Sequence, residues 1–404
     1  MKLGVEQRAV VESEILKRVR AHPGISRVAL SRKLQIAPST VGVYVGRLVS
    51  HGFLAETQSV DSTPGRPPTA LELNPNGGQF IGVDFEARSM TAMAVDFSAN
   101  PLRQAHGEIE AGDSASVILK RIERLILDML PGKKRRPLAI GIGAPGLVDP
   151  AKGVAVDYKY IKGWRNIALA APLARRFGAP VYLENTIRSM ALAELWFGQG
   201  RGVSDWVCLG IRSGIGAGIV AGGQLQRGAH YQAGEIGRWR CPWPEHPATR
   251  FFMGSGSARA ADAELQEVAS ARALLAAWER AQNGDRKNGR PARLLDAEFS
   301  ELVSEARRGD ALTMQLIAVV AEVLGWAVAQ LVLALNPSRV ILAGRLTPLG
   351  DALLDPLQRR AREVLRACGA EMPAIMNSAM GEYIGAWGAA ALALHEWKPA
   401  CDRS

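Results

Sequence analysis

The sequence predicts an α/β protein in two parts: a small N-terminal domain of three helices and two strands, and a larger α/β domain with two lobes. A chain of 404 residues is too long for one ordinary core, so two or three domains are expected. Apolar residues recur at helical spacing in the first part, and a strand-rich pattern that begins at residue 79 starts again after residue 205. We therefore predict domains at 1–75 and 79–404, the second with lobes at 79–200 and 201–404.

The overall composition is that of a globular protein, with 48% hydrophobic and 22% charged residues. The net charge is +10, and residues 1–75 hold 10 Lys and Arg against 6 Asp and Glu, which is compatible with nucleic acid as a partner. The four cysteines are widely separated and form no CxxC pair, which argues against a zinc cluster and a disulfide framework. The first 20 residues lack the apolar centre of a signal peptide, and the apolar stretch 327–335 is too short for a bilayer span. We expect a soluble, cytoplasmic protein without a membrane partner.

The first domain has the element order of a helix-turn-helix. Residues 6–21 carry apolar side chains at intervals of three and four, which predicts a helix ended by His22-Pro23-Gly24. A second helix is expected from Ser26, and the connection 35–38 has the length of a helix-turn-helix turn. The third helix begins at Pro38 and runs to about His51, before a glycine that can cap it.

The third helix has one apolar face and one mixed face. Val41, Val45 and Leu48 share the face that we expect to pack inward, whereas Val43 and the polar residues point elsewhere. Short polar groups at the start of a helix, followed two turns later by an arginine, suit contacts to phosphates and base edges in a major groove. The candidate DNA-contacting residues on this helix are Ser39, Thr40, Tyr44 and Arg47.

Two short predicted strands, 53–56 and 69–73, enclose a basic loop after the third helix. Arg66 in this loop is a further candidate, since an arginine of a wing can enter a minor groove or hold a phosphate. The combination predicts a winged helix-turn-helix that binds a double-stranded DNA operator. A small helical domain that binds another protein is the alternative. Because such domains read two half-sites through a two-fold axis, we expect a homodimer or homotetramer.

The larger domain opens with strands expected at 79–84, 90–96 and 101–109, a helix at 114–130 and a strand at 138–143. This order is typical of an actin-like or ribonuclease-H-like nucleotide-binding lobe. Strands expected at 206–211 and 218–221, followed by long helices, repeat it in part. Two such lobes would enclose a ligand cleft. The helical regions 309–335 and 385–395 are expected in the core, with subunit contact as the alternative.

Several segments of this domain resemble the ROK family of repressors and sugar kinases, in its regulator branch, which includes xylose and N-acetylglucosamine repressors. Residues 141–149 resemble the family's G-x-G-x-P-G-x-V-D turn, and residues 233–237 match its A-G-E-x-G segment. The other matching segments are 164–166, 180–185, 193–198, 214–220, 336–337 and 340–344. The resemblance implies a DNA-binding transcriptional regulator, acting as a repressor of carbohydrate-related genes. A sugar kinase with an accessory N-terminal domain is the alternative.

The residues that kinases of the family need for catalysis are altered here. The family's catalytic base is the Asp directly after Glu-Asn, and Thr186 stands in its place, with no useful basicity near neutral pH. The family's D-x-G-G-T phosphate loop is replaced by residues 84–88, in which Phe85 and Glu86 oppose a triphosphate. We therefore expect no enzyme activity and no nucleotide cofactor.

The family's zinc and sugar sites are also altered. Arg238 stands where the family has a zinc-binding His, and Cys241 is the one nearby cysteine, so no metal is expected. Asn185 and Glu235 persist from the sugar pocket and are candidates to hydrogen-bond an effector, whereas the family's later pocket Glu is lost, its position falling near Phe251. Arg238 either forms an internal ion pair with Glu235 or binds an anionic ligand such as a sugar phosphate. We expect a sugar or sugar-derived effector, with a scaffold that binds none as the alternative.

Overall fold

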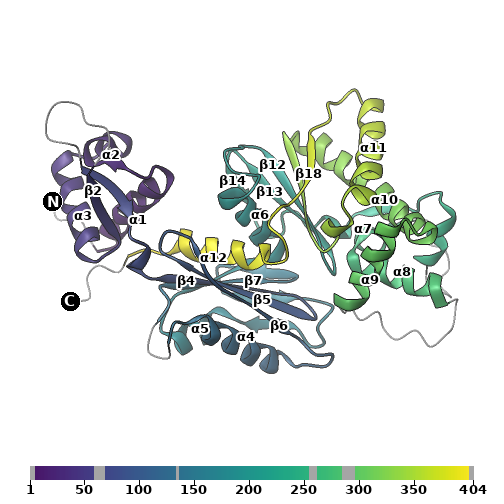
Figure 1. Ribbon diagram of the computed structural model, residues 1–404, viewed down its shortest axis with the longest axis horizontal. Coiled ribbons are helices and arrows are strands. Elements are labelled where there is room, and N and C mark those ends of the chain that lie inside the picture. The colour runs from purple at the N-terminus through teal and green to yellow at the C-terminus, as the bar shows by residue number, and fades with distance from the viewer. Residues whose placement is uncertain (1–4, 59–68, 133–135, 254–261, 284–295, 400–404) are drawn as a thin grey trace.

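The computed structural model describes residues 5–58, 69–132, 136–253, 262–283 and 296–399. It has a small N-terminal domain beside two larger α/β lobes (Figure 1). The N-terminal domain contains three helices and a three-stranded sheet of order β1-β3-β2. Its elements are α1 (Val5–Ala21), β1 (Ile25–Ser26), α2 (Arg27–Leu34), α3 (Pro38–Ser50), β2 (Leu54–Gln58) and β3 (Thr69–Leu73).

Local sequence signals set the boundaries of the helix-turn-helix. The Ser26 hydroxyl accepts a hydrogen bond from the N–H of Ala29 (3.2 Å) and so caps α2. Gln35 ends α2 in the left-handed region, at φ 55°, and Pro38 occupies the first turn of α3. Val41, Val45 and Leu48 are fully buried, as predicted. The short strand β1 was not predicted, because two residues carry no periodic signal.

The first lobe is built on a five-stranded sheet of order β11-β7-β4-β5-β6, in which β4, β7 and β11 run parallel. Helices α4 and α5 cover one face of this sheet, and α12 (Ile384–Glu396) lies on the other (Figure 1). The strands β8, β9 and β10 form a separate small sheet. The elements are β4 (Gln79–Phe85), β5 (Ser89–Asp96), β6 (Pro101–Glu108), α4 (Ala115–Met129), β7 (Ala139–Ala144), β8 (Leu147–Asp149), β9 (Val154–Asp157), β10 (Arg165–Ala168), α5 (Ala170–Phe177), β11 (Val181–Asn185) and α6 (Thr186–Phe197).

The second lobe holds another five-stranded sheet, of order β14-β13-β12-β17-β18. Helix α6 packs on one face of it, while α7, α10 and α11 lie on the other (Figure 1). Its strands are β12 (Trp206–Ile211), β13 (Ile215–Ala221), β14 (Gln224–Gln226), β15 (Arg240–Pro242), β16 (Asp262–Glu264), β17 (Arg339–Gly344) and β18 (Ala374–Asn377). Its α-helices are α7 (Leu265–Ala269), α8 (Ala271–Asn283), α9 (Asp296–Arg308), α10 (Ala311–Leu335) and α11 (Asp351–Ala367).

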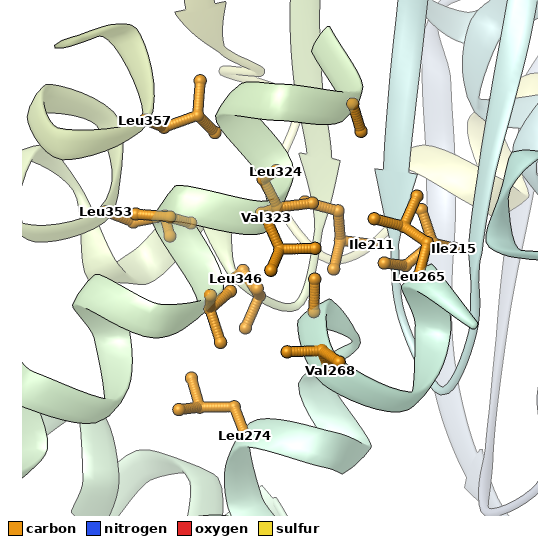
Figure 2. Packing of buried hydrophobic residues seen from close by; sticks show 14 of the residues in the cluster. Ile211, Ile215, Leu265, Val268, Leu274, Val323, Leu324, Leu346, Leu353 and Leu357 are labelled. Atoms are coloured by element: carbon orange, nitrogen blue, oxygen red, sulfur yellow. The ribbon is translucent and has the colours of Figure 1, made fainter. Parts of the chain in front are cut away.

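Helix α10 is the centre of the second lobe's core. Figure 2 shows Val323 and Leu324 of α10 packed among Ile211, Val268 and Leu353 from the surrounding elements. Among the described helices, α10 alone is long and apolar enough to cross a membrane, and 72% of its most apolar window is buried inside the protein. The helical core region predicted at 309–335 is confirmed as α10 (Ala311–Leu335), and the short apolar stretch 327–335 is its last part.

Helix α12 returns from the second lobe to the first and packs closely on its sheet. Gly82 of β4 and Gly141 of β7 allow this approach, because a Cβ at either position would overlap a carbonyl oxygen of α12. The structure thus differs from the predicted division of the lobes at residue 200, since α12 lies with the first lobe. The sequence pattern could not show this, because packing partners far apart along the chain leave no local signal.

The N-terminal domain shares a hydrophobic core with the first lobe. Trp397, directly after α12, packs against Phe53 of the N-terminal domain and Phe80 of β4, with ring centroids 5.2 and 5.8 Å apart. Phe97 completes this aromatic cluster. The connection between the N-terminal domain and the first lobe forms a 3₁₀ turn, η1 (Pro75–Gly77), and Asn74 Nδ2 donates a hydrogen bond to the Gly52 carbonyl (2.8 Å). The DNA-binding domain is therefore packed against the lobe.

Candidate effector cleft and DNA-binding face

A cavity of about 280 Å³ lies between the two lobes. Its walls come from the carboxyl ends of strands in both sheets, where ligands usually bind in α/β proteins. The lining residues used below are Glu86, Asn185, Thr186, Arg212, Glu235 and Arg238. The sequence predicted this cleft, and the structure brings the candidate effector residues Asn185, Glu235 and Arg238 together in its wall.

Buried ion pairs join the two lobes at the base of the cleft. Arg212, after β12, pairs with Asp84 of β4, and its Nη2 lies 3.4 Å from Glu86 Oε1. Arg345, after β17, pairs with the same Glu86 oxygen (2.8 Å), and the Ser213 hydroxyl donates to Glu86 Oε2 (2.8 Å). We call these five residues the interlobe ion cluster. Both acidic side chains are at most 3% exposed, so the pairs are desolvated.

The two carboxyl groups of the interlobe ion cluster titrate differently. Burial opposes ionisation of Glu86, but the guanidinium groups of Arg212 and Arg345 outweigh it and lower the pKa of Glu86 to about 2. Burial raises the pKa of Asp84, with Arg212 as the main opposing influence. Glu86 is thus the firmly ionised member that holds both arginines.

Asn185 supports the cleft wall through its own hydrogen bonds. Its Oδ1 accepts from the N–H groups of Ile187 (2.8 Å) and Arg188 (3.2 Å) and so caps α6, while Nδ2 donates to the Gly146 carbonyl (2.8 Å). Neighbouring Glu184 is fully buried and pairs with Arg188 (2.7 Å) and Arg227 (2.6 Å). Sequence reasoning missed these two arginines.

Glu235 directly precedes the short 3₁₀ turn η2 (Ile236–Arg238) and Arg238 ends it, with Glu235 half-buried and Arg238 exposed. No ion pair joins them in the described part of the chain, so the predicted internal pair is not found. Burial raises the pKa of Glu235, against the fields of Arg188 and Arg238. The cavity wall therefore offers one acceptor and one cationic donor to a ligand.

A second set of contacts crosses the mouth of the cleft. The loop after β9 in the first lobe carries Lys159 and Tyr160. Lys159 lies 3.8 Å from Glu264 of the second lobe. The Arg272 guanidinium of α8 lies 4.5 Å from the centroid of the Tyr160 ring, a cation–π distance. The cavity is thus bridged at its base and at its mouth.

The predicted DNA-contacting residues have different surroundings. Ser39 is exposed and Thr40 half-buried at the start of α3. Arg47 is 26% exposed and its Nε lies 3.2 Å from the buried carboxylate of Glu12, so it ties α3 to α1. Arg66 lies outside the described residues. The roles of these residues in DNA contact stay predictions.

The expected outward direction of Tyr44 was wrong. Its side chain is 6% exposed and belongs to the shared hydrophobic core. Tyr44 lies three residues after Val41 and four before Leu48, so the 3.6-residue period places its ring over the same buried face. The tyrosine ring is largely apolar, and treating it as a polar residue led to the error.

Two family models match this architecture. Residues 80–396 match the model of the ROK family, which is most of the chain. The chain belongs to the ROK family. Residues 11–54 match a winged helix-turn-helix DNA-binding model, in agreement with the three helices and the paired strands of the N-terminal domain.

Relatives of the chain include repressors. The xylose repressor of Caldicellulosiruptor bescii is 28% identical over 353 residues, which are 85% of each chain. The DNA-binding transcriptional dual regulator NagC of Escherichia coli K12 is 27% identical over 359 residues, 87% of this chain and 85% of NagC. A crystal structure of a ROK family transcriptional regulator, a homologue of the E. coli MLC protein, aligns with a TM-score of 0.74 at 23% identity over 96% of both chains.

These matches extend over both domains. The fold is the predicted one, a winged helix-turn-helix followed by a bilobal, actin-like ROK domain. The chain is a DNA-binding transcriptional regulator of the ROK family, and the alternative of a sugar kinase with an accessory domain is not supported.

The nucleotide site of a ROK kinase does not fit the residues present here. Phe85 is buried in the first lobe against Trp164, with ring centroids 5.4 Å apart, and Glu86 projects an ionised carboxylate where the family's loop has glycine. A phosphate would compete with Glu86 for Arg212 and Arg345. Thr186 is buried, and its hydroxyl donates to the Phe85 carbonyl (3.5 Å).

The zinc module of the family does not fit either. Cys241 is buried with its thiol directed at the Ala263 carbonyl (3.5 Å), and burial raises its pKa to about 11, which opposes the thiolate that zinc needs. His246 Nδ1 accepts a hydrogen bond from the N–H of Ala248 (3.1 Å). Within the described ranges, no three His, Cys, Asp or Glu side chains gather as metal ligands.

Proposed function

We propose that this ROK regulator is a repressor of carbohydrate-related genes whose interlobe cleft binds a small polyhydroxylated effector. One observation carries the proposal: the cleft presents Glu235 and Arg238 to a ligand, in a domain that shares its hydrophobic core with the DNA-binding domain. The name of the xylose repressor supports sugar genes as the target.

A sugar or sugar derivative suits the groups in the cleft. Hydroxyl groups both donate and accept hydrogen bonds, so they can satisfy a carboxylate and a guanidinium at once. The volume of about 280 Å³ is close to the lower end of ordinary small-molecule sites, about 300–1,000 Å³. An acidic sugar is the second candidate, favoured by Arg238 and by the cations Lys159 and Arg212 that also line the cavity.

We propose that the domain transfers no phosphoryl group. Thr186 cannot take a proton from a sugar hydroxyl near neutral pH. The ion pairs of the interlobe ion cluster hold the two lobes together, a role that a bound phosphate would otherwise have. In this proposal, binding of the effector alone changes how closely the two lobes approach each other.

Helix α12 is the proposed path from the cleft to the DNA-binding domain. At its start, Gly385 lies directly against the Asp84 carboxylate, where a Cβ would overlap it. At its end, Trp397 packs on Phe53, directly before the wing strand β2. A change in lobe closure that moves Asp84 would therefore shift α12 and alter the packing of Trp397 against the DNA-binding domain.

The proposed partner is a palindromic DNA operator, read by a homodimer or homotetramer in the cytoplasm. The test is fluorescence anisotropy of the full-length protein with DNA from upstream of its own gene, beside a thermal-shift panel of sugars, sugar acids and sugar phosphates. We expect tighter binding to this DNA than to random DNA of equal length, steep salt dependence and a thermal shift with a subset of the panel. Equal affinity for both DNAs would refute regulation of the neighbouring genes.

A further inference from the structure

The outward face of α3 carries an exposed valine. The helical period aligns Ser39, Val43, Gly46 and Ser50 on one line, opposite the buried face that contains Leu48. Val43 is 63% exposed, more than any other large hydrophobic side chain found exposed among the described residues. This face is the one that a winged helix-turn-helix places in the major groove.

Two glycines clear the space around Val43. A Cβ at Gly46 would meet nothing within 4 Å, and one at Gly42 would make only an ordinary contact with Arg27 Nη1 at 3.8 Å. Glycine destabilises the interior of a helix relative to alanine, so the fold gains nothing from glycine at these positions. Because Gly42 and Gly46 have no side chains, Val43 projects from this part of the helix surface without large neighbours beside it.

Two arginines near this face are held in ion pairs. Arg47 is held by Glu12 of α1. Arg27 Nη2 lies 2.7 Å from Glu56 of β2, and its Nη1 donates to the Gly42 carbonyl (3.4 Å). The usual reader of guanine is an arginine that donates two hydrogen bonds to the base edge. The centre of α3 instead offers an apolar side chain.

We infer that Val43 reads the C5-methyl groups of thymines, and that the operator half-sites carry A·T pairs under the centre of α3. Thymine is the one base with an apolar group in the major groove, and apolar side chains contact it there. The glycines on either side allow the helix to approach closely enough for this contact. The inference rests on the proposed function, because it requires that the protein bind an operator.

The test removes the methyl group and nothing else. The full-length protein selects its preferred site from a random duplex pool, and each thymine of that site is then replaced by deoxyuridine in separate duplexes. Fluorescence anisotropy at one salt concentration gives the dissociation constants. At one or two thymines of each half-site we expect roughly fourfold weaker binding, the effect of one methyl group transferred from an apolar contact to water.

Variants assign the effect to Val43. Val43→Ala alters the contact in both half-sites, so it should bind the thymine site about as weakly as the wild type binds a duplex with deoxyuridine at the contacted thymine of both half-sites, and deoxyuridine there should weaken this variant little further. Val43→Thr, which keeps one methyl group, should retain part of the sensitivity. Val28→Ala is the matched control, because Val28 on α2 is also exposed, at 55%, and this variant should keep the full sensitivity.

The outcomes separate the inference from the function. A selected site whose affinity is indifferent to deoxyuridine would overturn the inference and leave the regulator function standing. Equal deoxyuridine sensitivity in Val43→Ala and the wild type would overturn it as well. Failure to select any site from the pool would overturn the inference together with the proposed function.

Discussion

Replacing Trp397 with alanine should loosen the N-terminal domain from the first lobe. The Trp397 side chain is 9% exposed and packs with Phe53, Phe80 and Phe97, with ring centroids 5.2–5.8 Å apart. Phe53 belongs to the DNA-binding domain, whereas Phe80 belongs to the sheet of the first lobe. The indole therefore fills the joint between two parts of the protein.

The expected cost follows from this burial. Truncating a buried aromatic side chain to alanine costs about 3–5 kcal/mol. We take the lower end, about 3 kcal/mol, because Trp397 lies at the edge of the core and keeps some exposure. If the N-terminal domain opens as a unit, that loss corresponds to a roughly 150-fold rise in its opening equilibrium.

Amide hydrogen exchange followed by mass spectrometry measures the opening of the N-terminal domain peptide by peptide. In Trp397→Ala, peptides from α1 and α3 should exchange roughly 150-fold faster, while peptides from α10 should not change. Trp397→Phe should restore most of the protection. Trp243→Ala is the control, since Trp243 is a half-buried tryptophan that packs on the core of the second lobe. Unchanged exchange in α1 and α3 would refute the shared core as the link between the domains.

Three further predictions concern the cleft. Because the folded-state pKa of Glu86, about 2, lies below its ordinary 4.5, the stability it contributes is complete above pH 4.5 and is lost as the pH falls toward 2. Urea denaturation should show a loss of about 3 kcal/mol over that range, and Glu86→Gln should lack this part of the pH dependence. Glu235→Gln should weaken effector binding by about 10- to 100-fold in calorimetry, with DNA affinity unchanged in the absence of effector. Thr186→Asp should show no sugar-dependent ATP consumption in a coupled assay, because Glu86 of the interlobe ion cluster still opposes binding of the triphosphate.

Each of these has a contradicting result. An acid-induced loss of the same size in Glu86→Gln would mean that other groups carry the pH dependence. Full effector affinity in Glu235→Gln would remove the carboxylate from the ligand site. Measurable turnover by Thr186→Asp would show that a nucleotide enters the cleft despite Glu86.

Local patterns predicted most of the fold. The three helices of the N-terminal domain, their inward face at Val41, Val45 and Leu48, and the repeated strands of the two lobes all follow from periodicity and breakers in neighbouring residues. Tyr44 shows the limit of this approach at one residue. Its position in the helical period was visible in the sequence. Its side chain has both an apolar ring and a polar hydroxyl group, so the sequence alone did not show whether it would be buried.

Contacts between distant residues could not be predicted. Arg345 and Glu86 are 259 residues apart, and Arg212 and Asp84 are 128 apart, so no sequence interval connects them. The same holds for α12, whose alanine-rich sequence marks a buried helix but does not say which sheet it covers. The sequence did show that the phosphate loop was altered, but not that its acidic residue now joins the two lobes.

In the proposed mechanism, effector binding in the cleft changes the affinity of the DNA-binding domain for its operator. Its most direct test is the affinity of the full-length protein for its selected DNA site, measured by anisotropy with and without a sugar that stabilises the protein in the thermal-shift panel. We expect a change in affinity of about 5- to 150-fold, the usual range of coupling between two sites, and a much smaller change in Trp397→Ala. Equal affinity with and without the saturating sugar would contradict it.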